Sequence, residues 1–341
     1  AQRPPVLQAI DFLCIVIFLF QSSDAGVAPL VKLNDGRQIP ALGLGTWLGF
    51  TKTGDRVKLK ENEVERAVEW AIDAGYRHID TAAIYGTELQ VGSAVNKKIA
   101  EGVIKREDIY ITTKLWNDRH AKESVLPSLR ESLKRLNLTY VDLYLIHWPF
   151  ISSQENQSFA SIDYVETWRA MIEARDQGLT RSIGVSNFNE NQLDRLISLS
   201  SVTPAVLQVE INLNLQQPSL LSYCRRAGIA VTGYTPFGAL FGRVADAPAP
   251  RHDDDAMRAI AARYNKTIAQ IALRYEVELG VIPLPKSITE ERIKENIAVF
   301  DFELSPEERE QLRGYDNNFR VIPAKKFLQS PYYPFEKKLI K

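Results

Sequence analysis

One stretch decides how the chain folds: Gly75-Tyr76-Arg77-His78-Ile79-Asp80-Thr81-Ala82-Ala83-Ile84-Tyr85-Gly86. It predicts the end of a helix, a short buried strand and then a loop. The loop places a carboxylate, Asp80, and a phenol, Tyr85, five residues apart. Asp is also a common turn and helix-capping residue, so the pair alone can be explained by a turn. The rest of the chain decides between a turn and a chemical role.

Short apolar runs alternate with helix-period segments along the chain from Leu30 onward. We expect strands at 41–45, 78–80, 109–115, 143–146, 182–185, 206–209, 230–234 and 281–283. We expect helices after them at 62–74, 88–100, 124–136, 164–177, 190–200, 218–227, 256–264 with 268–278, and 289–300. No Gly-rich dinucleotide fingerprint follows the first strand. The order therefore predicts an α/β fold in which eight parallel strands and their helices form a (β/α)8 TIM barrel.

Three further segments lie outside these strand-helix units. The turn signal Asn34-Asp35-Gly36, within residues 31–39, predicts a short N-terminal β-hairpin. Residues 306–314 predict an extra helix. Residues 315–341, with several Pro and aromatic residues, predict a C-terminal loop over the active-site face. No break in composition divides residues 26–341, so we expect one domain there.

Residues 1–25 differ from the rest of the chain. An uninterrupted apolar run from Phe12 to Phe20 follows Arg3 and precedes a Ser-x-Ala tripeptide that ends at Ala25. This pattern resembles a cleaved secretory signal peptide, and the run is shorter than the roughly 20 residues that span a bilayer. Asp11 beside the run weakens that interpretation, and a disordered leader or a buried strand is the alternative. We expect secretion, with a cytoplasmic location as the alternative.

The composition excludes several classes of partner. The 341 residues are 45% hydrophobic and 25% charged, with 42 Lys and Arg against 42 Asp and Glu. This balance gives no excess positive charge for nucleic acid or an anionic membrane. Two cysteines, Cys14 and Cys224, and four scattered histidines provide neither a disulfide framework nor a metal motif. We therefore expect no nucleic acid, membrane or metal partner.

Polar residues interrupt the apolar strands at one end. In a barrel, active sites lie at the C-terminal ends of the strands. The polar residues at those ends are Asp80, Lys114, His147, Ser186, Asn187, Gln208, Glu210, Tyr234, Lys286 and Ser287. Each has a structural explanation when taken alone, since a buried Lys is commonly half of an ion pair and a buried His a core residue. Their convergence favours an active site.

Four residues, Asp80, Tyr85, Lys114 and His147, can form a proton-delivery unit. A lysine ammonium beside a tyrosine lowers the phenol pKa from about 10, and a carboxylate keeps the lysine charged. A neutral imidazole can orient a substrate oxygen. The unit suits protonation of the alkoxide that forms when a carbonyl accepts hydride. Hydrolysis by Asp80 and Glu210 is the nearest alternative, but nothing indicates the separation that such a carboxylate pair needs.

The segment 285–296 offers a site for the phosphate end of a cofactor. It runs from the last strand into a helix, whose free backbone amides and positive dipole end suit phosphate. The side chains of Lys286, Ser287 and Arg292 add charge-assisted donors. A capped helix with solvated charges is the bland explanation. Two cations and a hydroxyl would favour a 2′-phosphate, and hence NADPH/NADP+ over NADH.

These segments resemble the aldo-keto reductase family over nearly all of the chain from Leu30 to about Asp316. The matching segments are 43–47, 75–85, 114–116, 143–149, 184–188, 208–210 and 285–287. The resemblance implies a monomeric, NADPH-dependent reductase with Asp80, Tyr85 and Lys114 joined to His147 as the catalytic tetrad. It implies Tyr85 as the general acid. A non-catalytic NADP-binding barrel, acting as a sensor or structural protein, is the alternative.

The resemblance also implies the residues that contact cofactor and substrate. Cofactor contacts are implied for Thr46, Trp47, Asp80, Ser186, Asn187, Gln208, Tyr234, Thr235, Pro236, Phe237, Gly238, Lys286, Ser287, Ile288, Arg292, Glu295 and Asn296. Substrate contacts are implied for Trp47, Tyr85, Trp116, His147 and Trp148. Such an aromatic cleft suits a hydrophobic small-molecule carbonyl compound, such as a steroid-like ketone. The loop at 48–51 and the signal-like leader resemble the insect branch that includes 3-dehydroecdysone reductases. The loop at 150–163 is shorter and that at 49–60 longer than in aldose-reductase-like members, so the substrate stays open.

Overall fold

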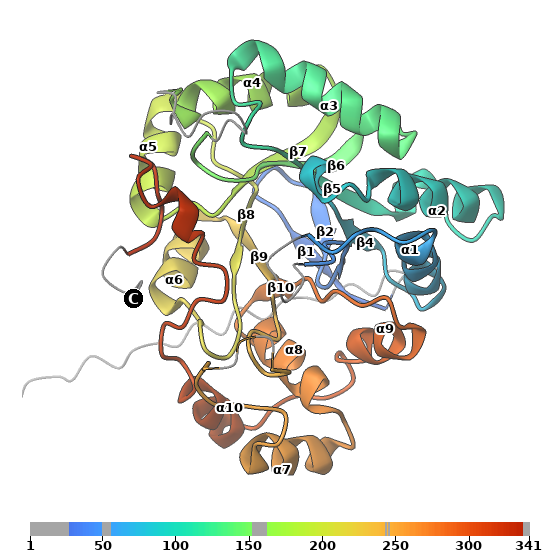
Figure 1. Cartoon of the computed structure of the whole chain (residues 1–341), viewed down its shortest axis with the longest axis vertical. Coiled ribbons are helices and arrows are strands. Elements are labelled where there is room, and N and C mark those ends of the chain that lie inside the picture. Colours follow the sequence, from blue (N-terminus) through green and yellow to red (C-terminus); the bar gives the residue numbers. More distant parts are fainter. Residues whose placement is uncertain (1–26, 50–55, 152–161, 243, 245, 337–341) are drawn as a thin grey trace, which may run out of the picture.

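The computed structural model describes residues 27–49, 56–151, 162–242, 244 and 246–336. Eight parallel strands follow one another in sequence order around the molecule, with helices outside them (Figure 1). The strands are β3 (Leu44–Gly45), β4 (His78–Asp80), β5 (Tyr110–Leu115), β6 (Val141–Ile146), β7 (Thr180–Ser186), β8 (Val206–Glu210), β9 (Ala230–Tyr234) and β10 (Val281–Pro283). The amides of Gly43 and Gly45 donate to the carbonyls of Pro283 and Pro285, at 3.1 and 2.9 Å, and so join the two edges. The expected (β/α)8 barrel is confirmed.

Helices surround the sheet and bury one face each. They are α1 (Glu63–Asp73), α2 (Glu88–Ala100), α3 (Lys122–Leu136), α4 (Tyr164–Asp176), α5 (Glu190–Ser200), α6 (Pro218–Ala227), α7 (Asp255–Tyr264), α8 (Ile268–Glu278), α9 (Glu290–Ile297) and α10 (Pro306–Arg313). In α1, the apolar positions Val64, Ala67, Val68 and Ala71 recur at helical spacing, and all four are buried. Burial of such faces is the main source of stability for helices of this length.

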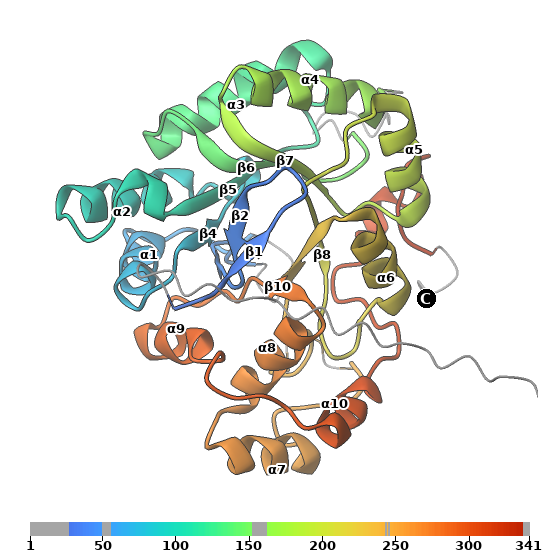
Figure 2. The same ribbon diagram turned by 180° about the vertical axis from the view of Figure 1, so that it is seen from behind.

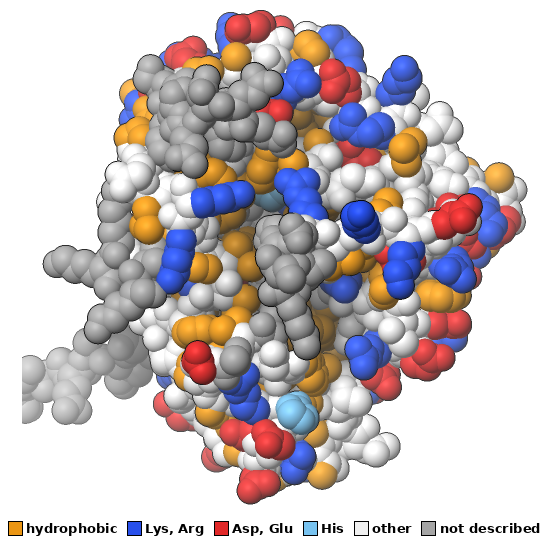
Figure 3. All heavy atoms as spheres, viewed as in Figure 1, with side chains coloured by type: hydrophobic (Ala, Val, Ile, Leu, Met, Phe, Trp, Pro, Cys, Tyr) orange, Lys and Arg blue, Asp and Glu red, His pale blue; other side chains and the backbone are white. Residues whose placement is uncertain are grey.

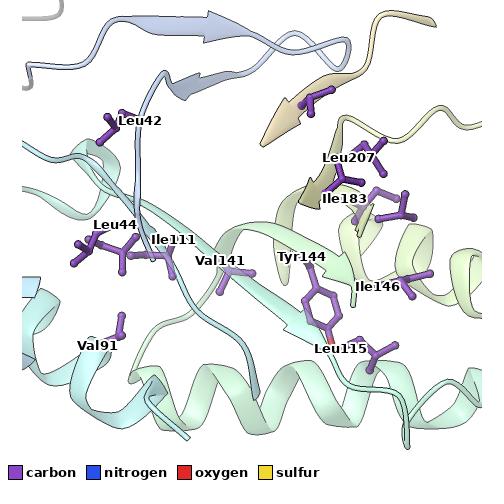
Figure 4. Packing of buried hydrophobic residues seen from close by; sticks show 14 of the residues in the cluster. Leu42, Leu44, Val91, Ile111, Leu115, Val141, Tyr144, Ile146, Ile183 and Leu207 are labelled. Carbon is purple, nitrogen blue, oxygen red and sulfur yellow. The ribbon is translucent and has the colours of Figure 1, made fainter. Parts of the chain in front are cut away.

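The core lies between the strands and the helices. Figure 4 shows Leu44 of β3 and Ile111 of β5 on the side of Val91 of α2, and Tyr144 of β6 beside Leu115. Close packing of this layer depends on Gly92 of α2, because a Cβ there would collide with the Leu136 carbonyl of α3. The short, continuously apolar strands are therefore explained by burial on both faces of the sheet.

The N-terminal hairpin consists of β1 (Leu30–Lys32) and β2 (Gln38–Pro40), paired antiparallel as expected. Figure 2 shows it lying across the end of the barrel that is turned away in Figure 1. Its turn is fixed by hydrogen bonds to the strand ends. The Asn34 amide donates to the Pro204 carbonyl at 2.9 Å, and the Ser182 hydroxyl donates to Asp35 at 2.6 Å. The hairpin closes the N-terminal end, so chemistry is confined to the other.

The C-terminal tail, residues 315–336, crosses that other end, as expected for a loop over the active-site face (Figure 1). The amides of Asn317 and Phe319 donate to the Asn214 carbonyl at 3.2 and 3.0 Å. Within the described ranges, no helix is long and apolar enough to cross a membrane. The leader predicted at residues 1–25 lies outside the described residues.

Most predicted element bounds lie within two residues of the structure, and two differ from it by three residues. The strand expected at 41–45 consists of Leu44–Gly45 only. Gly43 still donates a hydrogen bond to the Pro283 carbonyl of β10, the last strand of the barrel. The helix expected at 289–300 ends at Ile297. The helix stops there because the next carbonyl, that of Ala298, accepts hydrogen bonds from two side chains. Lys266, just before α8, and Gln270 of α8 both donate to it at 3.0 Å.

Candidate active site at the C-terminal ends of the strands

Strand register brings a carboxylate, an ammonium and a phenol together. Asp80 ends β4 opposite Thr112 of β5, and Lys114 faces the same side two residues later. The Lys114 ammonium therefore reaches Asp80, with Nζ 2.6 Å from Oδ1. It also donates to the Thr81 carbonyl at 2.9 Å and to the Tyr85 hydroxyl at 3.3 Å. The loop after β4 thus holds Tyr85 beside the charged pair, as the sequence predicted.

The direction of the Tyr85 pKa corrects the sequence analysis. Lys114 is fully buried, and burial lowers its pKa while Asp80 opposes that change. The expected net lowering of the Tyr85 pKa is not found: burial of the hydroxyl, and then the Asp80 carboxylate and Tyr234, raise it well above its usual value near 10. Desolvation of the hydroxyl is the largest of these effects. The phenol therefore carries its proton at neutral pH.

His147 follows β6 and lies against the same group. Its ring meets the Tyr85 ring edge-on, with centroids 5.7 Å apart, and the Trp116 ring in the same way at 5.0 Å. Burial, and then the positive charge of Lys114, lower the His147 pKa well below its usual value. The imidazole is neutral at physiological pH, as predicted. Its Nδ1 has no hydrogen-bond partner in the described part of the chain.

A ring of polar side chains continues from Asp80 around the barrel mouth. The Gln208 amide donates to Asp80 Oδ2 at 2.9 Å, and the Ser186 hydroxyl donates to the Gln208 carbonyl at 2.9 Å. Asn187 donates to the His147 carbonyl at 3.0 Å and accepts from the Tyr234 hydroxyl at 2.8 Å. The residues predicted to hold a nicotinamide therefore form one network with the acid-base group. A bound carboxamide would take its partners from this network.

Thr46 and the loop after β9 extend the ring on the side of β3 and β10. The Thr46 hydroxyl donates to the Asp80 carbonyl at 2.9 Å. In the loop, Thr235 and Gly238 have positive φ values of 54° and 48°, and the Gly238 amide donates to the Thr235 carbonyl. A Cβ at Gly238 would come within 2.7 Å of Asn212. The predicted contacts Pro236 and Phe237 lie in this tight turn.

The segment after β10 has the features of a phosphate site. Helix α9 begins without a side-chain cap, so its first amides are not taken by its N-cap residue, Thr289. The Ser287 hydroxyl accepts from the Thr289 amide at 3.0 Å. Exposed Lys286 and Arg292 flank this helix start. Of the other predicted contacts here, Asn296 is buried, whereas Ile288 and Glu295 are exposed. These donors fit an anionic cofactor end.

Aromatic side chains surround the reacting group unequally. The Trp47 ring stacks on Tyr85, with centroids 6.2 Å apart, and Trp116 contacts His147. Trp148 instead packs within an aromatic cluster under the tail, 5.4 Å from the Phe150 ring and mostly buried. Figure 3 shows hydrophobic side chains, and Lys and Arg side chains, gathered about the centre of this face. Trp47 and Trp116 are thus the tryptophans beside the reacting residues.

Glu210 has a role that the sequence analysis missed. Its two carboxylate oxygens accept from the backbone amides of Val321 and Ile322, at 2.7 and 2.9 Å. Both oxygens of Asp80 are likewise taken, by Lys114 and Gln208. Both carboxylates are therefore engaged with other groups, and the geometry gives no support to a hydrolytic pairing of Asp80 with Glu210. The one signal for this role in the sequence was Glu210 itself, because a carboxylate buried at a strand end needs hydrogen-bond donors. Those donors are backbone amides in the distant tail.

Two further buried groups were not singled out. Asn117 and His120 follow β5 and are almost fully buried, and their side-chain nitrogen and oxygen atoms have no hydrogen-bond partner among the described residues. Burial lowers the His120 pKa to about 3, so this ring is neutral. The described residues include no group of three or more His, Cys, Asp or Glu that could hold a metal ion.

Comparison with known proteins gives one consistent result. The model of the Aldo/keto reductase family matches residues 41–317. Aldo-keto reductase AKR2E4 of Bombyx mori is 48% identical over 308 residues, which cover 90% of this chain and 98% of that protein. Human aldo-keto reductase family 1 member A1 is 41% identical over 307 residues, covering 86% and 91%.

Solved structures agree with these relatives. The crystal structure of Bombyx mori AKR2E4 in complex with NADP has a TM-score of 0.86 at 47% identity, and covers 90% of this chain and 99% of that one. The structure of AKR2E5 complexed with NADPH has a TM-score of 0.87 at 44% identity, covering 91% and 94%. With a family model over most of its length and relatives of this identity, the chain belongs to the aldo/keto reductase family.

Proposed function

We propose that the protein reduces an aldehyde or ketone to an alcohol with NADPH, and that Tyr85 is the proton donor. The observation that carries the proposal is the Lys114 ammonium, which lies 2.6 Å from Asp80 and 3.3 Å from the Tyr85 hydroxyl in a buried site. NADPH, when bound, supplies the hydride. The residues of the chain supply the proton, the orientation of the carbonyl and the exclusion of water.

Proton transfer from Tyr85 follows from the charges around it. The raised pKa keeps the phenol protonated until an alkoxide, a far stronger base, forms beside it. The phenolate that results lies next to Lys114, whose charge is held in place by Asp80. The neutral His147 imidazole can donate a hydrogen bond to the carbonyl oxygen and orient it, without competing as an acid.

Cofactor binding is supported by two groups of residues. Ser186, Asn187 and Gln208 present amide and hydroxyl groups that match a carboxamide. At the other end of the cofactor, the uncapped start of α9 with Lys286 and Arg292 suits a 2′-phosphate. The crystal structures of Bombyx mori AKR2E4 in complex with NADP and of AKR2E5 complexed with NADPH support the same choice of cofactor.

A hydrophobic ketone is the proposed substrate, with 3-dehydroecdysone as the specific candidate. The carbonyl would meet Tyr85 and His147, while Trp47 and Trp116 contact the apolar body. The similarity to an insect reductase supports this choice.

We also propose that residues 26–341 act as a monomeric domain and that residues 1–25 are removed on secretion. N-terminal sequencing of secreted protein tests the cleavage, and an intact chain inside cells contradicts it.

The experiment is a turnover assay with a carbonyl panel. NADPH oxidation is followed with the full chain and with aldehydes, small ketones and ecdysteroid ketones. The proposal expects saturable oxidation with equal amounts of alcohol formed, and the highest kcat/KM for the bulky ketones. NADPH binding without acceleration by any carbonyl would favour the sensor or structural alternative. Faster turnover of small polar aldehydes than of ketones would refute the substrate class alone.

A further inference from the structure

A second cleft, of about 650 Å³, lies where the tail crosses the N-terminal ends of α5 and α6. Its apolar walls are formed by Phe188, Val209, Leu215, Leu220, Phe319 and Phe335. None of Asp80, Tyr85, Lys114 and His147 lines it, so it is separate from the site of proton transfer. Its volume falls in the range of about 300–1,000 Å³ that is typical of small-molecule sites.

Arg320 gives this cleft an anion-binding group. Its guanidinium carbon lies 3.6 Å from the centre of the Phe335 ring, so stacking holds the group in place. Its Nη1 is buried and has no hydrogen-bond partner in the part of the chain that the structure describes. A buried N–H donor without an acceptor is costly. The side chain as a whole is only half-buried and lines the cleft, so the guanidinium can donate to a ligand there.

The acidic groups near Arg320 are already engaged or lie at the margin. Glu190 accepts a hydrogen bond from the Ser219 hydroxyl at 2.8 Å, and Glu336 is exposed at the edge of the cleft. Glu210 lies behind the tail, where both of its oxygens accept from tail amides. None of these contacts satisfies Arg320 Nη1. Burial raises the pKa of Glu210, and the positive charge of Arg320 lowers it. No ion pair joins Arg320 to a carboxylate within the described ranges, so its guanidinium can also donate to an occupant of the cleft.

The start of α6 adds to the attraction for an anion. The helix begins at Pro218 after Gln217, which makes no side-chain cap, and Pro218, Ser219 and Leu220 all line the cleft. The backbone amides of Ser219 and Leu220 precede the first intrahelical hydrogen bond, from Leu221 to the Gln217 carbonyl. Uncapped amides and the positive end of a helix dipole favour negative charge. This supports Arg320 rather than forming a site by itself.

We propose that this cleft binds a small amphiphilic anion, in which an apolar ring system carries one carboxylate or sulfonate group. The Arg320 guanidinium, which lines the cleft, donates to the anionic group, and the phenylalanine and leucine side chains contact the rings. The tail that forms this wall also carries Ile322, which packs on the cluster of Trp148 and Phe150 beside the carbonyl site.

Two matched probes separate charge from shape. The anionic probe is 8-anilinonaphthalene-1-sulfonate, and the uncharged probe is N-phenyl-1-naphthylamine, which has the same rings without the sulfonate. Both are titrated by fluorescence against the full chain with NADP+ at saturation. Arg320→Gln is expected to weaken binding of the sulfonate about tenfold or more and to leave the uncharged probe unchanged. Arg320→Lys restores part of the sulfonate affinity, because it restores the charge.

Filling the cleft provides an independent test. Ser219→Phe introduces a ring at a lining position and is expected to abolish binding of both probes. Ser222→Phe, on the same helix but outside the lining, is the control and leaves both affinities unchanged. Equal sulfonate affinity in the wild type and Arg320→Gln would overturn the proposal, as would equal effects of the two serine variants. If Arg320→Gln does not fold, the serine pair decides. The readout is binding, so it does not depend on the proposed substrate.

Discussion

The two ends of the barrel use buried polar groups in different ways, and β4 shows the contrast within three residues. At the end closed by the hairpin, His78 is fully buried, and its Nε2 lies 3.0 Å from the Thr112 hydroxyl. Burial lowers its pKa to about 3, so it is neutral. At the open end, Asp80 is held as a charge by Lys114 and Gln208. His78 is thus a neutral buried group, whereas Asp80 and Lys114 form a buried ion pair beside a phenol.

This difference teaches where chemistry is possible in the fold. Neutral polar groups that hydrogen-bond to each other, such as His78 and Thr112, can be buried at little electrostatic cost. A buried ion pair does not by itself stabilise a protein, since desolvation offsets the attraction. A functional role therefore explains why Asp80 and Lys114 are kept as a buried ion pair. The buried His78 is explained by its place at the end of the barrel that the hairpin closes. Substitutions at the two ends should have effects of different kinds.

The largest combined effect on turnover and stability is expected for Lys114→Met. It removes the charge beside Tyr85 and leaves the Asp80 carboxylate buried with only Gln208 as its side-chain partner. Turnover should fall by about a thousandfold, and the free energy of unfolding by about 3–5 kcal/mol. NADPH oxidation and urea denaturation measure the two effects. Lys114→Arg, which retains the charge, should recover most of the stability. A folded Lys114→Met protein with near-normal turnover would contradict the functional role of the pair.

A smaller effect is expected for Glu210→Gln, which changes the carboxylate that accepts hydrogen bonds from the C-terminal tail. An amide offers one acceptor oxygen in place of two, so one of the Val321 and Ile322 amides loses its partner. The KM for a bulky ketone should rise by about tenfold, corresponding to one lost hydrogen bond, with kcat little changed. Hydrogen exchange at those two amides should quicken. Glu303→Gln, at a glutamate exposed by 85%, is the control. A change confined to kcat would show that Glu210 acts on the chemistry.

The smallest effect is expected at the closed end, for His78→Gln. The folded-state pKa of about 3 lies below the unfolded value near 6.5, so the unfolded chain binds more protons between these pH values. The His78 contribution to wild-type stability should therefore fall as pH drops from 6.5 toward 3, by up to about 1.4 kcal/mol per pH unit. His78→Gln should remove this contribution and leave those of His120 and His147, without changing kcat at pH 7. His252→Gln, at an exposed histidine, should keep the wild-type slope. Unfolding measured across pH decides.

Much of this arrangement could be predicted from the sequence because it depends on local pattern. The alternation of apolar strands with amphipathic helices predicted the barrel. The position of Asp80, Lys114 and His147 at strand ends predicted that they share one rim, which the structure confirms. Adjacent parallel strands carry such residues to the same edge whatever the details of packing.

The rest could not be predicted because it depends on burial and on contacts distant in sequence. The Tyr85 pKa is set by desolvation that no motif reports, so its predicted direction was wrong. Glu210 is bound by amides that follow it by more than a hundred residues, and this bond has no local signature. The end of α9 depends in the same way on the capture of the Ala298 carbonyl by Lys266 and Gln270.

The assignment of Tyr85 as proton donor is the central claim, and one substitution tests it most directly. Tyr85→Phe removes the hydroxyl and keeps the ring, so stacking on Trp47 and the Asp80–Lys114 pair should survive. Tyr223→Phe, at a surface tyrosine bonded to Asp194, is the control. We expect kcat for NADPH oxidation with a ketone to fall by about a hundredfold to ten thousandfold in Tyr85→Phe alone, with NADPH affinity unchanged. Turnover within a few-fold of the wild type would contradict the account.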